Sequence, residues 1–592
     1  MPHDFSIVLL AAVIEGAGLA AAFAVAAALA RRFGSAGDGP ALWATCGVGL
    51  LGYAALFAFL PGRGFGNLCC AAAAAAVLSG AVAGRRHMRA RDLALPALSL
   101  SAGLLYLAVA HLGTASFAGD LQASLSFERA MPYDDRIPLL FAEAVYHHLP
   151  TRTGPDPYGW YFTDRPPLQA GFVLAFSWLW RGLDPELAYR ALGTLLQSVS
   201  VGAAWLLCRR LGFGRGETRF ATLAYATSGF AYYESVYAWP KLLAAAYLMV
   251  ACAALGAPLL ERRRARMPEA LPFAAALGLA LLSHGAVAFA VIPLVALVAG
   301  SRLLGARGLV AAGAVVLGLY APWAAYTRVA DPNPGRLIRM HLTDSDVDGR
   351  DPLPEVLWRS YAGLTAEAWL TARTENLAAL WGEPELDALA GRLLAGIRDA
   401  RQQVPLVDGA DTWALTPSKL RYDLLSLGTV LRVDQTIHVL RALGLLNLAW
   451  PLGLLLLARR GPGGFGRGWA ALALLTALSS ATFVVLEFNG GGAVTVHGSY
   501  SIVVGLFLLV AVLAYRAGRR VAWWLFGANA GLTVLLWVAF SPGAVLEPVR
   551  RVQPVPLAVG LAAFAALAWL AGRRTGAAPA GPDALERGTA TF

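Results

Sequence analysis

Charged residues are scarce in this chain. Asp, Glu, Lys and Arg make up 14% of its 592 residues, whereas about a quarter of the residues of a soluble protein are charged. Hydrophobic residues make up 57%, and the mean hydropathy is +0.57. Apolar runs of about 20 residues recur along most of the sequence, and each is long enough to cross a bilayer core. The composition therefore excludes a soluble globular protein and predicts an all-α protein that crosses the membrane many times.

Cysteine and lysine are also rare. The five cysteines lie in or beside apolar runs, which disfavours a disulfide framework and a thiolate metal site. Only two lysines are present, so the net charge of +11 comes from arginine. The arginines lie at the ends of the apolar runs rather than in one basic patch, so the charge does not indicate a nucleic-acid partner. Frequent Ala, Gly and Arg with so little Lys are typical of a GC-rich bacterial genome.

The arginines form eight clusters that alternate with the apolar runs. Loops rich in Lys and Arg stay on the cytoplasmic side of a membrane because they are poorly translocated. The clusters lie at residues 31–32, 85–91, 209–219, 262–266, 302–307, 459–467, 516–520 and 573–574. Placing all of them in the cytoplasm predicts thirteen to fifteen transmembrane helices in the bacterial cytoplasmic membrane. The predicted spans are 5–30, 41–60, 67–83, 93–112, 187–208, 218–233, 241–260, 270–283, 286–304, 308–326, 436–457, 468–487, 498–515, 521–540 and 554–571.

This topology leaves two long segments on the outer face, 113–186 and 327–435. Within the first, residues 168–181 are apolar but too short for a comfortable span, so we expect a helix lying along the outer surface. Within the second, residues 352–403 have helical periodicity and predict a small helical cap. Transmembrane helices then follow over 436–574, and the polar tail 575–592 is expected to be disordered in the cytoplasm.

The first outer segment contains a group of acidic residues. Asp134 and Asp135 lie just before Pro138, and Asp120 lies upstream. Proline is favoured in the first turn of a helix, so a short helix is expected from Pro138. The positive end of that helix would favour ionised carboxylates, which suit a general base or a divalent-metal ligand. An ordinary helix cap is the alternative.

A second motif lies later in the same segment. Asp164 and Arg165 precede Pro166-Pro167, and the two prolines fix an extended entry into the expected surface helix. An aromatic belt with a salt bridge at the membrane interface accounts for the same residues. Considered alone, this motif favours the interfacial aromatic belt with a salt bridge over a functional site.

Together, the two motifs resemble the first outer loop of the GT-C superfamily of glycosyltransferases. The likeness is closest to the protein mannosyltransferases and aminoarabinose transferases, in which an acidic pair precedes an aromatic-Ala-Glu segment and a Lys-Pro-Pro-Leu motif. Phe141-Ala142-Glu143 and Arg165-Pro166-Pro167-Leu168 match this pattern, with arginine in place of lysine. The resemblance covers residues 93–326, a GT-C-like core that residues 1–92 precede with extra transmembrane helices.

The resemblance implies an inverting glycosyltransferase that takes a sugar from a polyprenyl-phosphate carrier on the outer face. The acceptor would be an envelope glycan, lipid or protein, and membrane lipids would surround the spans. The carrier tail would need an apolar groove between helices, which is expected to open beside Asp134 and Asp135 near the outer leaflet. One carboxylate would deprotonate the acceptor hydroxyl. Asp135 is the first choice for this base, Asp134 the second and Asp120 the alternative. A divalent metal would bind Asp134 and Asp135 if the reaction uses one, and no other cofactor is implied.

Cationic side chains would stabilise the departing phosphate, whose charge increases as the bond breaks. The candidates for binding the donor are Arg165, Lys241, Asp164, His284 and Arg336. Lys241 follows Trp239-Pro240 at an expected outer helix end, where an interfacial snorkelling lysine is an equal alternative. Weaker candidates for the outer face are Arg339, His341, Glu487, His497 and Tyr500.

A lipid or solute transporter, or flippase, is the alternative function. Transporters usually place ionisable residues near the membrane midplane, often in paired repeats. The predicted spans contain few charges and no obvious internal repeat, and the polar residues concentrate in the outer segments. This distribution favours the enzyme.

Overall fold

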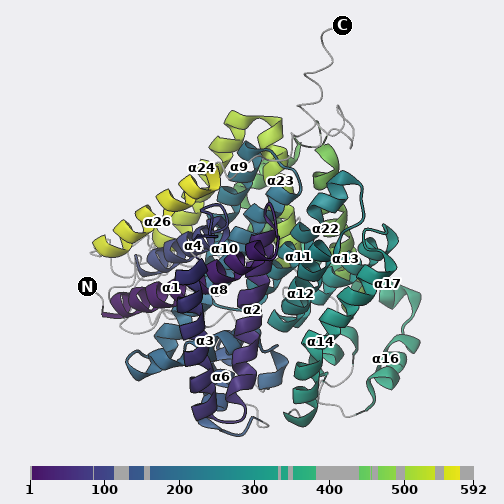
Figure 1. Cartoon of the computed structure of the whole chain (residues 1–592). Coiled ribbons are helices and arrows are strands. Elements are labelled where there is room, and N and C mark those ends of the chain that lie inside the picture. The colour runs from purple at the N-terminus through teal and green to yellow at the C-terminus, as the bar shows by residue number, and fades with distance from the viewer. Residues whose placement is uncertain are drawn as a thin grey trace, which may run out of the picture.

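The computed structural model describes residues 3–84, 86–112, 133–151, 161–330, 335–344, 351–381, 439–451, 453, 455, 465–488, 500–539 and 553–573. Within these ranges the secondary structure is entirely helical (Figure 1). Eleven of the helices are long and apolar enough to cross a membrane. They are α1 (His3–Arg32), α2 (Gly39–Phe59), α3 (Arg63–Gly84), α4 (Ala94–His111), α8 (Pro185–Arg210), α11 (Lys241–Glu261), α14 (Ala306–Ala330), α22 (Gly466–Leu486), α23 (Tyr500–Ala517), α24 (Arg519–Val534) and α26 (Pro554–Gly572). The prediction of an all-α, multi-pass membrane protein is confirmed.

Two shorter apolar helices, α12 (Met267–Ser283) and α13 (Ala288–Gly300), follow α11. The prediction of one continuous helix over 218–233 is wrong. The chain instead forms α9 (Arg215–Ala226) and α10 (Gly229–Val236), because the Ser228 hydroxyl accepts the Ala231 N–H at 3.1 Å and starts a new helix. Of the predicted span 436–457, the described part begins with α20 (Val439–Ala442) and the 3-10 turn η5 (Gly444–Leu448).

The described arginines of the eight clusters share one end of the helix bundle, which we call the arginine end. Contacts between successive loops join them in a continuous network: Arg31 with Asp92, Arg209 with Asp38, Ala265 with Leu303, Arg467 with Leu260, Gly468 with Leu211, Arg516 with Glu217 and Arg215 with Gly572. This is the arrangement that the alternation of arginine clusters and apolar runs requires.

The described parts of 113–186 and 327–435 meet at the opposite end, which we call the site end. The first segment forms the 3-10 turn η1 (Tyr133–Arg136), α6 (Ile137–His147), the 3-10 turn η2 (Phe162–Asp164), α7 (Leu168–Ala175) and the 3-10 turn η3 (Ser177–Arg181). The second forms α15 (Arg336–Leu342), α16 (Leu353–Ala362) and α17 (Ala366–Trp381). Arg336 Nη1 lies 3.3 Å from Asp164 Oδ2, and the Tyr326 hydroxyl lies 3.2 Å from Thr151 Oγ1.

Only the first half of the expected surface helix over 168–181 is helical and buried, as α7, while Trp178 in the following turn η3 is exposed. Leu168 to Leu174 are all buried, because α7 packs between α2 and α6. The packing is close: a Cβ on Gly171 would lie 2.1 Å from the Gly52 carbonyl oxygen. α7 is therefore part of the core, and it holds the preceding Asp164–Pro167 segment against the bundle.

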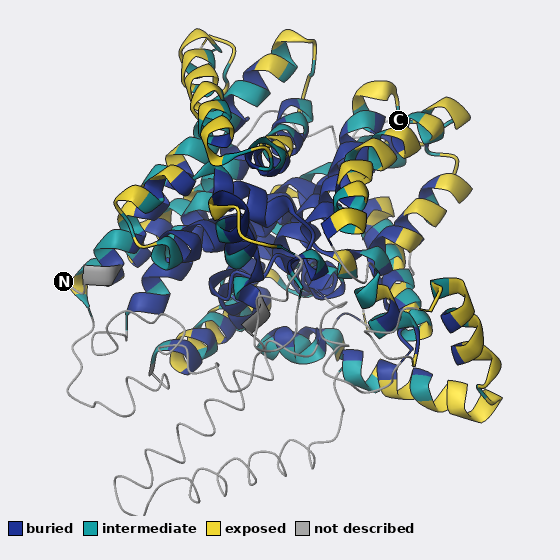
Figure 2. Ribbon diagram, turned by 90° about the horizontal axis from the view of Figure 1, so that it is seen from below, coloured by how far each residue is buried: buried dark blue, intermediate teal, exposed yellow. Residues whose placement is uncertain are grey.

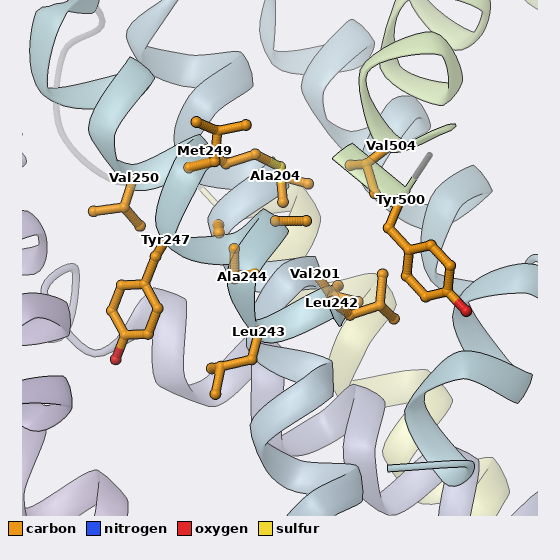
Figure 3. Close-up of a cluster of buried hydrophobic side chains, with 14 of the residues drawn as sticks. Val201, Ala204, Leu242, Leu243, Ala244, Tyr247, Met249, Val250, Tyr500 and Val504 are labelled. Atoms are coloured by element: carbon orange, nitrogen blue, oxygen red, sulfur yellow. The ribbon is translucent and has the colours of Figure 1, made fainter. Parts of the chain in front are cut away.

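Only the first part of the expected cap is described, as α16 and α17. Trp358 and Trp369 are exposed there, while Val356, Arg373, Asn376 and Leu380 are buried. The rest of the cap, Asp120, His497 and the tail 575–592 lie outside the described residues. Buried residues concentrate at the centre of the bundle (Figure 2), where side chains of α8, α11 and α23 pack together (Figure 3).

The accessibility of introduced cysteines tests which side of the membrane each end of the bundle faces. In a variant without the five native cysteines, we expect Leu149→Cys and Glu367→Cys to react with a membrane-impermeant thiol reagent in intact cells. Ala36→Cys, at the arginine end, should react only after permeabilisation, since arginine-rich loops face the cytoplasm. Labelling of only one of the two site-end positions would contradict this topology.

Candidate functional site

The site is built on the sharp turn between α10 and α11. Ala238 has a φ of +60°, a left-handed conformation that costs about 1–3 kcal/mol for a residue other than glycine. Gln169 Nε2 on α7 stabilises the turn by donating to the Ala238 carbonyl at 2.7 Å. Gly193 on α8 leaves room for it, because a Cβ there would lie 2.6 Å from Ala238 Cβ. The turn places Trp239, which is completely buried.

Three nitrogen-bearing side chains converge on the Trp239 ring, and we call them the cation cluster: Arg165, Lys241 and His284. Lys241 Nζ lies 2.8 Å from the centroid of the indole, the Arg165 guanidinium carbon 5.8 Å and the His284 ring centroid 6.3 Å. All three residues are at most 5% exposed. They come from distant parts of the sequence, namely the segment before α7, the start of α11 and the loop between α12 and α13.

His284 has a defined protonation state in this surrounding. Burial lowers its pKa well below the usual range, and the nearby Lys241, Arg165 and His341 lower that pKa further. The imidazole is therefore neutral at pH 7. Its Nδ1 accepts the Ala286 N–H at 3.1 Å, so the proton resides on Nε2. This Nε2–H is buried and has no hydrogen-bond partner among the described residues.

Asp164 and Arg336 form the rim of the cluster. The Asp164 carboxylate accepts the Tyr161 N–H at 2.8 Å and pairs with Arg336 at 3.3 Å. The Arg336 guanidinium also lies over the Tyr161 ring, 5.0 Å from its centroid. Asp164 thus fixes the segment that leads into Arg165, and it brings α15 of the second segment to the first.

A histidine–carboxylate pair lies beside the cluster. His341 Nδ1 on α15 is 2.9 Å from Glu487 Oε2, at the end of α22. Glu487 is fully buried. Arg373 and Asn376 on α17 donate to its backbone carbonyl at 2.6 and 2.7 Å, so the cap fixes this end of α22. Both residues of the pair were only weak candidates in the sequence.

Asp135 lies on the other side of Gln169. Its carboxylate is buried and forms an ion pair with Arg190 of α8, which also donates to Glu186 at 2.8 Å. The Tyr189 hydroxyl donates to the Asp135 carbonyl and accepts from Gln169 at 2.9 Å. Hydrogen bonds thus connect the Asp135 turn to the Trp239 turn.

The structure brings all five donor-binding candidates together: Arg165, Lys241 and His284 lie around Trp239, Asp164 adjoins Arg165, and Arg336 joins them through its ion pair with Asp164. Of the base candidates, Asp135 is placed in η1 and Asp120 lies outside the described residues, as does the side chain of Asp134. The described residues contain no group of three His, Cys, Asp or Glu that could hold a metal ion. The Asp135 carboxylate forms an ion pair with the Arg190 guanidinium.

Sequence reasoning missed Arg190 and Gln169. Arg190 did give a signal, because a charged residue inside an apolar span generally has a partner or a function. Gln169 gave none, since its importance comes from the turn at Ala238, which only the folded chain brings next to α7.

A narrow cavity lies between α8, α11, α13, α22 and α23. Its lining is mostly apolar and includes Leu248, Met249, Leu475 and Leu508. Leu248 lies about two turns along α11 from Lys241. The cavity thus begins a short distance below the cation cluster, toward the middle of the bundle.

No family model and no curated protein match the chain. Two similar solved structures are of ArnT from Cupriavidus metallidurans, a GT-C aminoarabinose transferase. The apo structure has 16% identity over 72% of this chain and 85% of that chain, with a TM-score of 0.29. The structure bound to undecaprenyl phosphate has 14% identity over 77% and 87%, with a TM-score of 0.32. At such TM-scores the likeness carries no argument about the site.

The Asp135–Arg190 ion pair changes the expected effect of removing the carboxylate. A helix-start carboxylate alone contributes only about 1 kcal/mol. Breaking a buried ion pair costs about 3–5 kcal/mol, because the remaining charge is left uncompensated. We therefore expect Asp135→Asn to lower the unfolding temperature of the purified protein clearly.

The double variant Asp135→Asn/Arg190→Gln is the control. It removes both charges, so its unfolding temperature should lie above the value expected from adding the two single effects. Additive effects, or a loss of only about 1 kcal/mol for Asp135→Asn, would show that the pair is not energetically coupled.

Proposed function

We propose that the chain is a membrane glycosyltransferase of the GT-C type. It transfers a sugar from a polyprenyl-phosphate carrier to a cell-envelope acceptor on the outer face of the cytoplasmic membrane. The cation cluster is the observation that carries this proposal. Arg165, Lys241 and the Nε2–H of His284 meet at the site end of the membrane helices, where the headgroup of a lipid carrier would lie.

The chemistry of the cluster suits a phosphate. Arginine and lysine both bind phosphate oxygens through charge-assisted hydrogen bonds. His284 adds a neutral donor whose buried N–H lacks a protein acceptor in the described part of the chain, and a buried donor without an acceptor costs about 1–3 kcal/mol. A phosphate oxygen at this position would accept that hydrogen bond and recover the cost.

The position of the cluster at the end of the membrane helices supports a lipid-linked rather than a soluble phosphate. The apolar cavity between α11 and α23 has a volume of about 30 Å³, room for about one water molecule, so an isoprenoid tail could enter there only if these helices separate. The expected groove beside Asp134 and Asp135 stays a prediction, since the Asp135 side chain is fully buried and pairs with Arg190.

The proposed reaction is a displacement at the anomeric carbon. The acceptor hydroxyl gives its proton to a base, its oxygen forms a bond to the anomeric carbon, and the bond from that carbon to the phosphate oxygen breaks. The electron pair remains on the phosphate, where Arg165, Lys241 and His284 stabilise the added charge. Attack from the face opposite the phosphate inverts the configuration.

The proposed base is a carboxylate of the first outer segment. Asp135 remains the first candidate because Tyr189 and Gln169 connect its turn to the Trp239 turn. In the structure this carboxylate pairs with the Arg190 guanidinium, and an acceptor hydroxyl would have to take the place of that partner. Asp134 and Asp120 remain the alternatives.

Removing one positive charge from the cation cluster should strongly slow sugar transfer. We expect Lys241→Gln to lower the transfer rate by about 10²–10³-fold, the usual effect of removing one group that stabilises a developing charge. Arg165→Gln should act similarly. The measurement is transfer of radiolabelled sugar from polyprenyl-phosphate donors by the purified protein in liposomes. Arg359→Gln, an exposed cation of α16, is the matched control and should retain activity.

The same assay separates an enzyme from a transporter. An enzyme cleaves the bond between carrier and sugar, whereas a flippase moves the intact carrier across the bilayer. If every reaction leaves the carrier intact, and if the movement of the carrier across the bilayer depends on Lys241, the protein is a flippase and the proposed transferase is wrong.

A further inference from the structure

A second cationic site lies at the arginine end, far from the cation cluster. The ends of α1, α3 and α4 surround an open cavity of about 360 Å³. Its lining consists of Arg31, Gly34, Ser35, Ala36, Arg86, His87, Arg89 and Arg91. Four arginines and a histidine therefore face one small space.

The nearby carboxylates do not neutralise this space. Asp92 lies against Arg31, with Nε to Oδ2 at 2.5 Å, and against Arg91 at 3.9 Å. Asp38, in the loop between α1 and α2, pairs with Arg209 of α8 at 3.4 Å. Arg86 and Arg89 consequently contribute positive charge that neither aspartate offsets.

The cavity lies at the end of a helix whose apolar surface is exposed. α3 packs against α1 and α2, and only 6% of its apolar window is buried. Most of its surface must therefore contact lipid, because a helix of this composition requires an apolar surrounding. The arginines lie directly at the end of this lipid-facing helix, which is the level of the headgroups.

We propose that this cavity binds the phosphate of an anionic phospholipid in the leaflet at the arginine end. Its acyl chains would lie along α3, while Arg86 and Arg89 bind the headgroup phosphate. Basic pockets between transmembrane helices on the cytoplasmic side are suited to such headgroups. Arg31 and Arg91 already pair with Asp92, so their guanidinium groups have fixed positions at the side of the cavity. The lipid would fasten α3 to the rest of the bundle.

The proposal is independent of sugar transfer, so it is tested by lipid binding. The full-length protein in detergent is titrated with dioctanoyl phosphatidylglycerol or dioctanoyl phosphatidylcholine, and bound lipid is counted by native mass spectrometry. We expect phosphatidylglycerol to bind and phosphatidylcholine to bind far more weakly. Each arginine at the headgroup level contributes about 1 kcal/mol, so Arg86→Ala/Arg89→Ala should weaken phosphatidylglycerol binding about thirty-fold.

Two variants control for charge and for folding. Arg302→Ala/Arg307→Ala removes two exposed arginines from another loop of the same end, and it should bind phosphatidylglycerol like the wild type. Arg86→Lys/Arg89→Lys preserves the charge and should retain most of the affinity, which also covers the case in which the alanine variant does not fold.

Three results would overturn the proposal. The first is equal loss of binding in the Arg302/Arg307 variant, which would mean a general charge effect. The second is equal binding of the two lipids. The third is displacement of phosphatidylglycerol by millimolar inorganic phosphate, which would mean that the cavity takes a soluble anion.

Discussion

The turn that carries Trp239 is the constraint on which the site depends. It places Lys241 at the first turn of α11 and sets the buried Trp239 indole next to Arg165 and His284. The turn requires a left-handed Ala238, and this strained residue is held by Gln169 from α7 and accommodated by Gly193 on α8. The burial of α7, which first looked like a surface helix, thus has a direct role in placing the cations.

The fold separates two kinds of positive charge. At the arginine end, arginines join successive loops through carboxylates and backbone carbonyls, as in Arg516 with Glu217 and Arg215 with Gly572. At the site end, Arg165 and Lys241 are buried and lie around one aromatic ring together with the neutral His284. A buried cation is costly unless an opposite charge is near, so these two side chains require anionic groups around them, from the protein or from a ligand.

Sequence alone predicted the helical class, the grouping of the arginine loops and most of the residues that meet around Trp239. These features follow from local patterns: apolar runs of membrane length, arginines at their ends, and the Asp164-Arg165-Pro-Pro motif. The break at Ser228 has a local cause, the capping of Ala231 by the Ser228 hydroxyl, which the interpretation of 218–233 as one apolar run overlooked. The burial of α7 was not predictable from local patterns, because it depends on packing between distant helices. The partner of Asp135 was missed for the same reason, since Arg190 lies 55 residues further along the chain. The His341–Glu487 pair joins residues 146 positions apart.

The central claim is that the cation cluster binds the phosphate of a lipid carrier. The most direct test is an experimental structure of the protein with a polyprenyl phosphate. The account predicts a phosphate oxygen about 3 Å from His284 Nε2, with Lys241 and Arg165 on the same phosphate. A phosphate bound elsewhere, with the His284 N–H satisfied by a protein acceptor, would contradict the account.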